Sequence, residues 1–262
     1  MTKPAVLITG ASSGIGATYA DRFARRGHDL VLVARNADRM EELAARLRAE
    51  TGVTIDVMQA DLAVDADVAK VEARLRDDKR IGVLINNAGL ALAGAFEAQT
   101  AADLAQLVGV NTVAVLRLAH AVAPRFVAEG AGAIVNIGSV VGLVPEFGQT
   151  VYGATKAFVQ FLSQGLAHEL GPKGVYVQAV LPAGTATEIW SRAGADPSQV
   201  PPLMDVGALV DAALTGFDRR EAVTIPPLQD GAQWDAYQGA RLAMVPSFGA
   251  TVPAPRYLEA AQ

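Results

Sequence analysis

The sequence predicts an α/β protein whose strands and helices alternate along a single domain. Short runs of apolar, often β-branched residues recur from residue 5 to residue 180, and longer stretches with helical periodicity separate them. The runs are apolar at almost every position, which is typical of parallel strands that helices cover on both faces. The length of 262 residues suits one large domain of this class.

The alternation gives the approximate place of every element. We expect strands at residues 6–8, 30–33, 53–58, 83–85, 133–137, 175–180 and 222–225. We expect helices near residues 14–26, 38–50, 65–77, 101–127, 150–170, 206–217 and 231–245. A segment rich in Gly, Pro, Ala and Ser follows the sixth strand, and we interpret residues of about 183–205 as a substrate lid. Residues of about 246–262 form a C-terminal tail, and the single domain spans residues 1–262.

Composition argues against several classes of function. The chain has 27 acidic and 22 basic residues, and its net charge of -5 gives no basic field for a nucleic-acid partner. It contains no cysteine, which excludes disulfides and thiolate chemistry and fits a cytoplasmic location. Polar residues interrupt the most apolar stretch, 104–127, so we expect a buried helix there and no membrane partner. The three histidines, His28, His120 and His168, lack the spacing of metal ligands, so we expect no metal.

A glycine-rich string stands directly after the first strand, where a helix is expected to begin. It reads Thr9-Gly10-Ala11-Ser12-Ser13-Gly14-Ile15-Gly16, with the glycines in the order G-x-x-x-G-x-G. Glycines let the backbone approach a pyrophosphate, and the helix N-terminus offers unpaired N–H groups and a positive dipole. The alternative is a βα turn that binds nothing. The candidate cofactor-binding residues here are Gly10, Ser12, Ser13, Gly14, Ile15 and Gly16.

Further motifs together resemble the short-chain dehydrogenase/reductase family. They are the glycine string, Asn86-Asn87-Ala88-Gly89, Ser139, and Tyr152-Gly153-Ala154-Thr155-Lys156, in family order and spacing from about residue 5 to residue 187. The resemblance implies a Rossmann-type, doubly wound parallel sheet of about seven strands, with a dinucleotide across the carboxyl ends of the strands. It also implies a homodimer or homotetramer, because the helices near 101–127 and 150–170 often form the interface in relatives.

The end of the second strand indicates which dinucleotide is bound. A carboxylate at this place accepts from the ribose 2′-OH of NAD and repels the 2′-phosphate of NADP. The sequence here is Val33-Ala34-Arg35-Asn36, and the planar guanidinium of Arg35 is suited to a phosphate. We therefore expect a preference for NADP(H), with possible help from Arg39, while NAD stays an alternative. Otherwise Arg35 is a solvated loop residue.

The resemblance assigns other cofactor contacts. Asp61 matches the family aspartate that accepts from the adenine amino group, although an aspartate there also suits a helix cap. Asn87, Ala88 and Gly89 are expected to pass close to the adenosine ribose. After the sixth strand the family reads Pro-Gly, but this chain has Pro182-Ala183-Gly184, which leaves the loop register open. The other cofactor contacts that the resemblance implies are Leu62 beside the adenine, Pro182 beside the nicotinamide, and Thr187 or Thr185 at the nicotinamide carboxamide.

Tyr152 and Lys156 are the expected reacting pair. The two residues are four positions apart on an expected helix, so their side chains project from the same face. An ammonium beside a phenol favours the phenolate, so we expect Lys156 to lower the pKa of Tyr152. The resemblance also implies hydrogen bonds from Lys156 to the nicotinamide ribose. Ser139 follows the fifth strand and is placed to donate to a substrate oxygen. In the family, an asparagine at the position of Asn111 holds a water molecule that connects the lysine, here Lys156, to solvent.

These residues predict an oxidoreductase that interconverts a small-molecule carbonyl and a secondary alcohol, with Tyr152 as general acid and base. An apolar pocket is expected from Val140, Val141, Val144, Phe147, Ile189 and Trp190. Three alternatives stay open: a ketoreductase for a carrier-bound acyl chain, a regulatory protein that binds the cofactor without turnover, and a pure scaffold.

Overall fold

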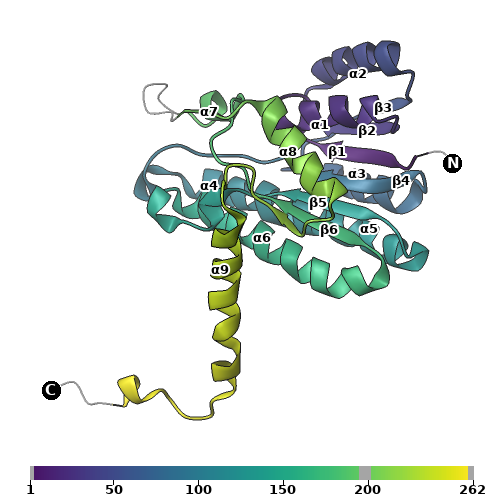
Figure 1. The fold of residues 1–262 in the computed structure, drawn as a ribbon. Coiled ribbons are helices and arrows are strands. Elements are labelled where there is room, and N and C mark those ends of the chain that lie inside the picture. The colour runs from purple at the N-terminus through teal and green to yellow at the C-terminus, as the bar shows by residue number, and fades with distance from the viewer. Residues whose placement is uncertain (1–2, 195–201, 259–262) are drawn as a thin grey trace. The chain divides into compact units, whose positions relative to one another are not determined.

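Seven parallel strands form the centre of the molecule (Figure 1). A computed structural model describes residues 3–194 and 202–258. The strands are β1 (Ala5–Thr9), β2 (Leu30–Ala34), β3 (Ile55–Gln59), β4 (Ile81–Asn86), β5 (Ala133–Ile137), β6 (Tyr176–Val180) and β7 (Val223–Thr224). Their order in the sheet is β3-β2-β1-β4-β5-β6-β7, which confirms the predicted doubly wound sheet. The order reverses between β1 and β4, so the crevice for a ligand opens at the carboxyl ends of these two strands.

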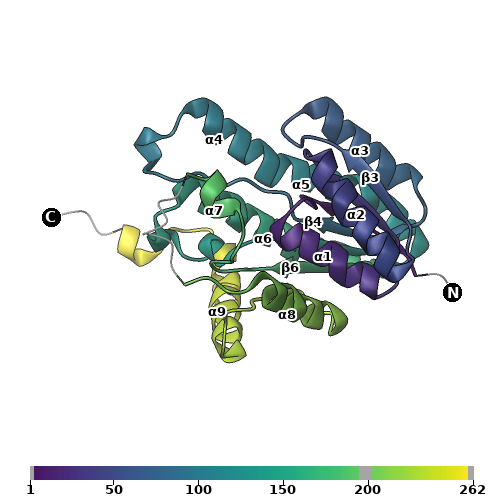
Figure 2. The same ribbon diagram turned by 90° about the horizontal axis from the view of Figure 1, so that it is seen from above.

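Helices cover both faces of this sheet (Figures 1 and 2). The described residues contain the helices α1 (Gly14–Arg25), α2 (Ala37–Thr51), α3 (Asp65–Asp77), α4 (Ala101–Val108), α5 (Val115–Glu129), α6 (Thr150–Leu170), α7 (Ile189–Arg192) and α8 (Val206–Asp218). A further helix, α9 (Gly231–Ala243), lies in the C-terminal part of the chain. One apolar core lies between the sheet and α1, α2 and α8. A second lies between the opposite face and α3, α5 and α6.

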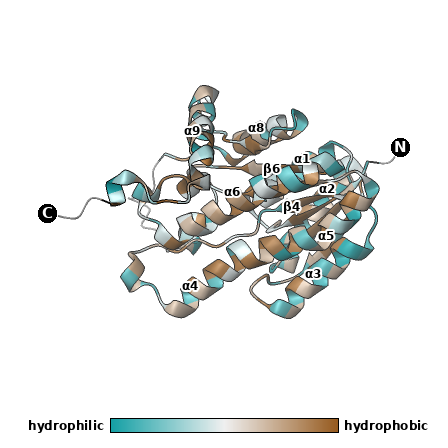
Figure 3. Ribbon diagram, turned by 90° about the horizontal axis from the view of Figure 1, so that it is seen from below, coloured by the Kyte–Doolittle hydropathy of each residue, from teal (hydrophilic) through white to brown (hydrophobic). Residues whose placement is uncertain are grey.

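The central strands are apolar because neither of their faces meets water. Every residue of β1, β2, β5 and β6 is buried. Figure 3 shows hydrophobic strands in the interior and helices of mixed hydropathy around them. Burial of one Val, Leu or Ile side chain stabilises a fold by about 1.5–3 kcal/mol. The sheet therefore supplies a rigid platform for the loops at its carboxyl edge.

The helix expected near residues 101–127 is interrupted, which corrects the prediction of one regular helix. α4 ends at Val108, a π-helical stretch runs over Gly109–Ala114, and α5 begins at Val115. Such π turns are often found at functional sites, and this one contains Asn111. By length and composition alone Ala101–Glu129 could cross a membrane, but 56% of its most apolar window is buried in the fold, as in the core helix of a globular protein.

The chain divides into two compact units, Met1–Pro226 and Pro227–Gln262. The first unit holds the sheet and all the candidate site residues. The second contains α9, which begins after Asp230, whose carboxylate accepts from the backbone N–H of Ala232 at 2.9 Å. That one domain spans residues 1–262 stays a prediction. Residues 195–201 of the expected lid and 259–262 of the expected tail lie outside the described residues.

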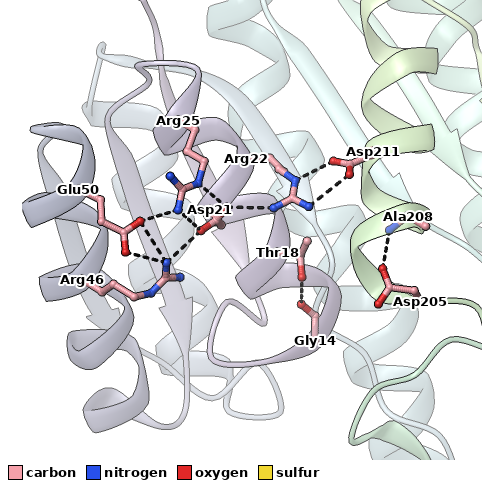
Figure 4. A network of polar contacts seen from close by, with 10 residues as sticks. All are labelled: Gly14, Thr18, Asp21, Arg22, Arg25, Arg46, Glu50, Asp205, Ala208 and Asp211. Atoms are coloured by element: carbon pink, nitrogen blue, oxygen red, sulfur yellow. Dashed lines mark hydrogen bonds and ion pairs between the residues drawn. The ribbon is translucent and has the colours of Figure 1, made fainter.

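A group of arginines around Asp21 connects three helices on one face of the sheet (Figure 4). The carboxylate of Asp21 accepts from Arg22 at 3.0 Å, from Arg25 at 2.9 Å and from Arg46 of α2 at 3.2 Å. Burial acts to raise the pKa of Asp21, but these hydrogen bonds outweigh it and hold the pKa below its usual value. Arg22 also donates to Asp211 of α8 at 2.7 Å. The network fixes α1, which begins at the glycine loop, against its neighbours.

Candidate active site

The glycine loop leaves room only for backbone at its closest points. Gly10 has a φ of +67°, and an added Cβ would lie 2.7 Å from Nδ2 of Asn87 and 2.9 Å from Cα of Ala88. A Cβ on Gly16 would overlap the carbonyl oxygen of Gly10. Ser13 is the N-cap of α1, but its side chain makes no capping hydrogen bond. The first N–H groups of α1 therefore face the crevice without a side-chain cap, as a phosphate site requires.

The Asn86–Gly89 turn braces this loop. Nδ2 of Asn87 donates to the carbonyl oxygens of Thr9 at 2.9 Å and Gly10 at 3.3 Å. The Thr9 hydroxyl accepts from the backbone N–H groups of Asn87 and Ala88, each at 3.0 Å. The structure thus gives Asn87 a positioning role beside the predicted contact with the ribose.

The residues expected around the adenosine lie at the ends of β2 and β3. Arg35 is exposed, and its carbonyl oxygen accepts from Nε2 of Gln59 at 2.9 Å. The carboxylate of Asp61 accepts from the backbone N–H of Ala63 at 2.9 Å, but it does not cap α3, whose N-cap is Val64. Leu62 packs against the core beneath α3. Both Asp61 and Leu62 stay predicted cofactor contacts.

The predicted catalytic residues meet at the carboxyl end of β5. Ser139 follows that strand and is 6% exposed; its hydroxyl donates to the carbonyl oxygen of Pro182 at 3.2 Å and accepts from the N–H of Val141 at 3.2 Å. Tyr152 and Lys156 lie in the first two turns of α6. Nζ of Lys156 is 5.6 Å from the centre of the Tyr152 ring. Ser139 and Tyr152, which belong to different elements, are in side-chain contact, so the three residues lie together.

Asn111 ties the site to the loop after β4. Its Oδ1 accepts from the N–H of Leu90 at 2.8 Å, and its Nδ2 donates to the carbonyl oxygen of Leu90 at 2.9 Å and to Oγ1 of Thr155 at 3.1 Å. A Cβ added to Gly89 would lie 3.4 Å from Oδ1 of Asn111 and 3.6 Å from Nζ of Lys156. The amide and the lysine thus both lie next to Gly89, and a Cβ there would only touch them.

The pKa values of the reacting pair differ from the prediction. Burial lowers the pKa of Lys156 to about 8. Burial also raises the pKa of Tyr152 to about 12, and a polar contact with the Ser139 side chain offsets this only in part. The expected lowering by the lysine is not seen, because removal of water disfavours the charged form of both groups. Of the two groups, Lys156 therefore has the pKa nearer to neutral pH.

Described lid residues reach the glycine loop. The Thr187 methyl group would lie 3.0 Å from a Cβ on Gly14. Thr185 is 5% exposed and its hydroxyl donates to the carbonyl oxygen of Ala183 at 3.0 Å. The carbonyl oxygen of Thr185 accepts from Nε1 of Trp190 at 2.8 Å. Of the two threonines proposed for the carboxamide, Thr187 is the one placed against the cofactor loop, while Pro182 is buried beside Ser139.

Two hollows lie near these residues. A cavity of about 960 Å³ is lined by α1, the lid and the start of α8, but by none of Ser139, Tyr152 and Lys156. A smaller hollow contacts Tyr152 directly and is lined by residues that include Leu92, Phe96, Leu107 and Gln149. Of the side chains expected to line a pocket, Trp190 lines the first cavity. The sequence reading missed the 92–99 segment, although its apolar start after Gly89 was a usable signal.

Comparisons with known proteins agree with this geometry. The family model described as short chain dehydrogenase matches residues 4–198. A short-chain dehydrogenase from Sphingobium yanoikuyae, solved in complex with NADPH, is 64% identical, with a TM-score of 0.95 over 97% of this chain and 99% of that one. A bulky-bulky ketone specific alcohol dehydrogenase from Comamonas testosteroni is 59% identical, with a TM-score of 0.92 over 99% and 100% of the two chains.

A more distant relative is the very-long-chain 3-oxoacyl-CoA reductase of Rattus norvegicus, which is 34% identical over 187 residues. The match covers 70% of this chain and 60% of the length of that relative. The fold is the Rossmann-type fold of dinucleotide-binding proteins. The chain belongs to the short-chain dehydrogenase family, and the resemblance seen in the sequence is confirmed.

Proposed function

We propose that this protein interconverts a ketone and a secondary alcohol with NADP(H), using Tyr152 as the general acid and base. The observation that carries the proposal is the meeting of Ser139, Tyr152 and Lys156 at the carboxyl end of β5, beside the glycine loop. A pure scaffold or a regulatory protein has no need of a buried lysine next to a half-buried tyrosine, because a lysine is costly to remove from water.

The residues present fit a dinucleotide phosphate. The glycine loop lets the backbone approach the pyrophosphate, and the uncapped start of α1 supplies N–H donors. Arg35 is exposed, and in the described part of the chain no carboxylate pairs with it, so its guanidinium is available for a 2′-phosphate. The bound nicotinamide supplies the hydride. The NADPH complex of the Sphingobium relative supports this choice, and NAD stays a weaker alternative.

The protein's own groups manage the charge and the proton. The Ser139 hydroxyl gives up its bond to the Pro182 carbonyl oxygen, donates to the ketone oxygen and stabilises the negative charge that develops there. Tyr152, with its pKa raised by burial, keeps its proton at neutral pH and donates it to the same oxygen. Lys156 lies beside it and exchanges protons near pH 8, so it resupplies the phenol. Asn111 holds the Leu90 loop open beside the lysine, along the expected route to solvent.

The substrate class is a ketone with apolar groups on both sides of the carbonyl. Phe96 is 58% exposed and borders the hollow at Tyr152, and Phe147 is 56% exposed in the turn before α6. The hollow holds only about 10 Å³, so a substrate would lie over exposed apolar side chains such as Phe96, which favour apolar substituents. The ketone specificity of the Comamonas relative supports the same class.

A substrate panel tests the proposal. Consumption of NADPH and of NADH is measured with a diaryl ketone, acetone and a 3-oxoacyl thioester. We expect turnover of the diaryl ketone with NADPH, at least about tenfold above acetone and above the same ketone with NADH. Preference for the thioester would instead support the activity named for the rat relative. No turnover with any carbonyl in either direction would contradict the proposal.

We also propose that the protein is a cytoplasmic homodimer or homotetramer. Five apolar side chains are exposed along the α4–α5 stretch and α6, and isolated exposure does not account for such a group. They are Val108, Val113, Leu116, Phe158 and Phe161. A second copy that presents the same face would cover them.

A further inference from the structure

A carboxylate next to the lid helix α7 binds two arginines at the edge of the cofactor crevice. The Glu188 carboxylate accepts from Nη1 of Arg39, with distances of 3.0 and 2.9 Å to its two oxygens. It also accepts from Nη2 of Arg192, one turn further along the lid. Arg39 lies in the first turn of α2, four residues after Arg35. The lid carboxylate thus occupies an arginine at the place where the sequence predicts recognition of the 2′-phosphate.

The same lid segment contacts the glycine loop. Nη2 of Arg192 donates to Oγ of Ser13 at 3.3 Å, and Thr187 lies against Gly14. On its other side, the carbonyl oxygen of Ala193 accepts from the N–H of Ala93 at 3.0 Å. A change in the partner of Glu188 therefore acts on a lid that contacts the cofactor loop and the 92–99 segment beside Tyr152.

We propose that Glu188 is a selectivity residue that competes with the 2′-phosphate of NADP(H) for Arg39. The proposal rests on the proposed use of NADP(H). A phosphate monoester carries about -1.5 to -2 charges near neutral pH, against -1 for a carboxylate, and pairs more strongly with a guanidinium. The side chains of Arg39 and Glu188 are 47% and 45% exposed, and ion pairs as exposed as this are weak. The 2′-phosphate displaces Glu188 and shifts the lid, whereas NAD(H) leaves the pair intact.

The charges at this edge favour an anion. Arg39 and Arg192 share one carboxylate, and Arg35 adds a third guanidinium close by in the sequence. Neutralisation of Glu188 leaves the arginines in place and removes their internal partner. If Glu188 competes with the phosphate, this change should strengthen the binding of NADP⁺. If Glu188 instead helps to bind the cofactor, the change should weaken it.

The test compares Glu188→Gln with Glu41→Gln by calorimetric titration of NADP⁺ and NAD⁺. Glu41 is the matched control, because it is a carboxylate of α2 that pairs with Arg48 and not with the lid. We expect Glu188→Gln to tighten NADP⁺ about three- to tenfold and to change NAD⁺ less than about twofold. Glu41→Gln should change neither. Addition of Arg39→Gln to Glu188→Gln should abolish the gain.

Trp190 supplies a second readout that does not depend on turnover. The chain has two tryptophans, so a Trp234→Phe background leaves Trp190 of the lid as the sole emitter. NADP⁺ should shift the fluorescence emission of Trp190, and NAD⁺ should not. Without any cofactor, the Glu188→Gln variant should show the emission that the parent shows with NADP⁺ bound. Unchanged affinities in Glu188→Gln, or equal changes for both cofactors, would overturn the role of Glu188 alone. Failure of the parent to bind NADP⁺ would overturn the proposed function itself.

Discussion

Nζ of Lys156 donates to the backbone carbonyl oxygen of Ile137 at 2.9 Å, joining the helix that carries Tyr152 to the end of the strand that precedes Ser139. Ile137 is two residues before Ser139, so the bond sets the two hydroxyl-bearing segments relative to one another. Lys156 is 6% exposed, and its charged form is disfavoured by burial. The lysine therefore has a positioning role as well as a role in proton exchange.

Replacement of Lys156 by Met should change how stability depends on pH. The folded pKa is about 8, below the ordinary value of 10.5, so between these values the unfolded chain binds more protons than the folded one. The stability linked to this group is fully present above pH 10.5 and is lost as pH falls to 8. The free energy of unfolding of the parent, relative to Lys156→Met, should rise by up to about 3 kcal/mol across that range.

Urea unfolding of both chains without added cofactor, between pH 7.5 and 10.5, measures this difference. The titration of Tyr152 is present in both chains and largely cancels. A difference that stays constant with pH would show that the ammonium of Lys156 is not desolvated.

Gly10 and Gly27 should respond differently to alanine. Both have positive φ values, +67° and +79°, so each substitution should cost about 1–2 kcal/mol of stability through the left-handed backbone. A Cβ on Gly10 would meet Asn87 and Ala88, whereas a Cβ on Gly27 meets nothing within 4 Å. Only Gly10→Ala should weaken NADP⁺ binding, by more than about tenfold in a calorimetric titration. Equal retention of NADP⁺ affinity by both variants would count against the glycine loop as the phosphate site.

Phe161 should report the proposed assembly. It is 80% exposed on α6, and Phe161→Lys places a charge in the expected contact between copies. Light scattering after size exclusion should show a smaller assembly than that of the parent. Val64→Lys is the control, because Val64 is 48% exposed at the start of α3, outside the proposed face. A monomeric parent, or an assembly unaffected by Phe161→Lys, would argue against this interface.

Much of the fold could be predicted because its signals are local. The apolar runs that became β1, β2 and β5 are buried at every residue, so burial on both faces leaves a clear mark in the sequence. The predicted bounds of α3 and α6 agree with the structure. Motif order likewise placed Ser139, Tyr152 and Lys156 together, because the carboxyl ends of parallel strands share one edge.

Other features depend on contacts between distant residues. The π-helical stretch contains Asn111, whose amide bonds to Leu90 and Thr155, and helical periodicity does not encode such contacts. The raised pKa of Tyr152 depends on how much water the folded chain excludes, and spacing to Lys156 gave the wrong sign. The pairing of Glu188 with Arg39 joins residues 149 positions apart in a segment without a regular pattern.

Removal of a single hydroxyl by Tyr152→Phe is the most direct test of the central claim. Turnover of the ketone with NADPH and the affinity for NADP⁺ are measured together. Tyr176→Phe is the matched control, because the Tyr176 hydroxyl lies outside the site and donates to the carbonyl oxygen of Glu221 at 2.8 Å. We expect Tyr152→Phe to lower turnover by about 10²- to 10⁴-fold with NADP⁺ affinity within about twofold, and Tyr176→Phe to retain turnover. Full turnover by Tyr152→Phe would contradict the assignment of Tyr152 as the general acid and base.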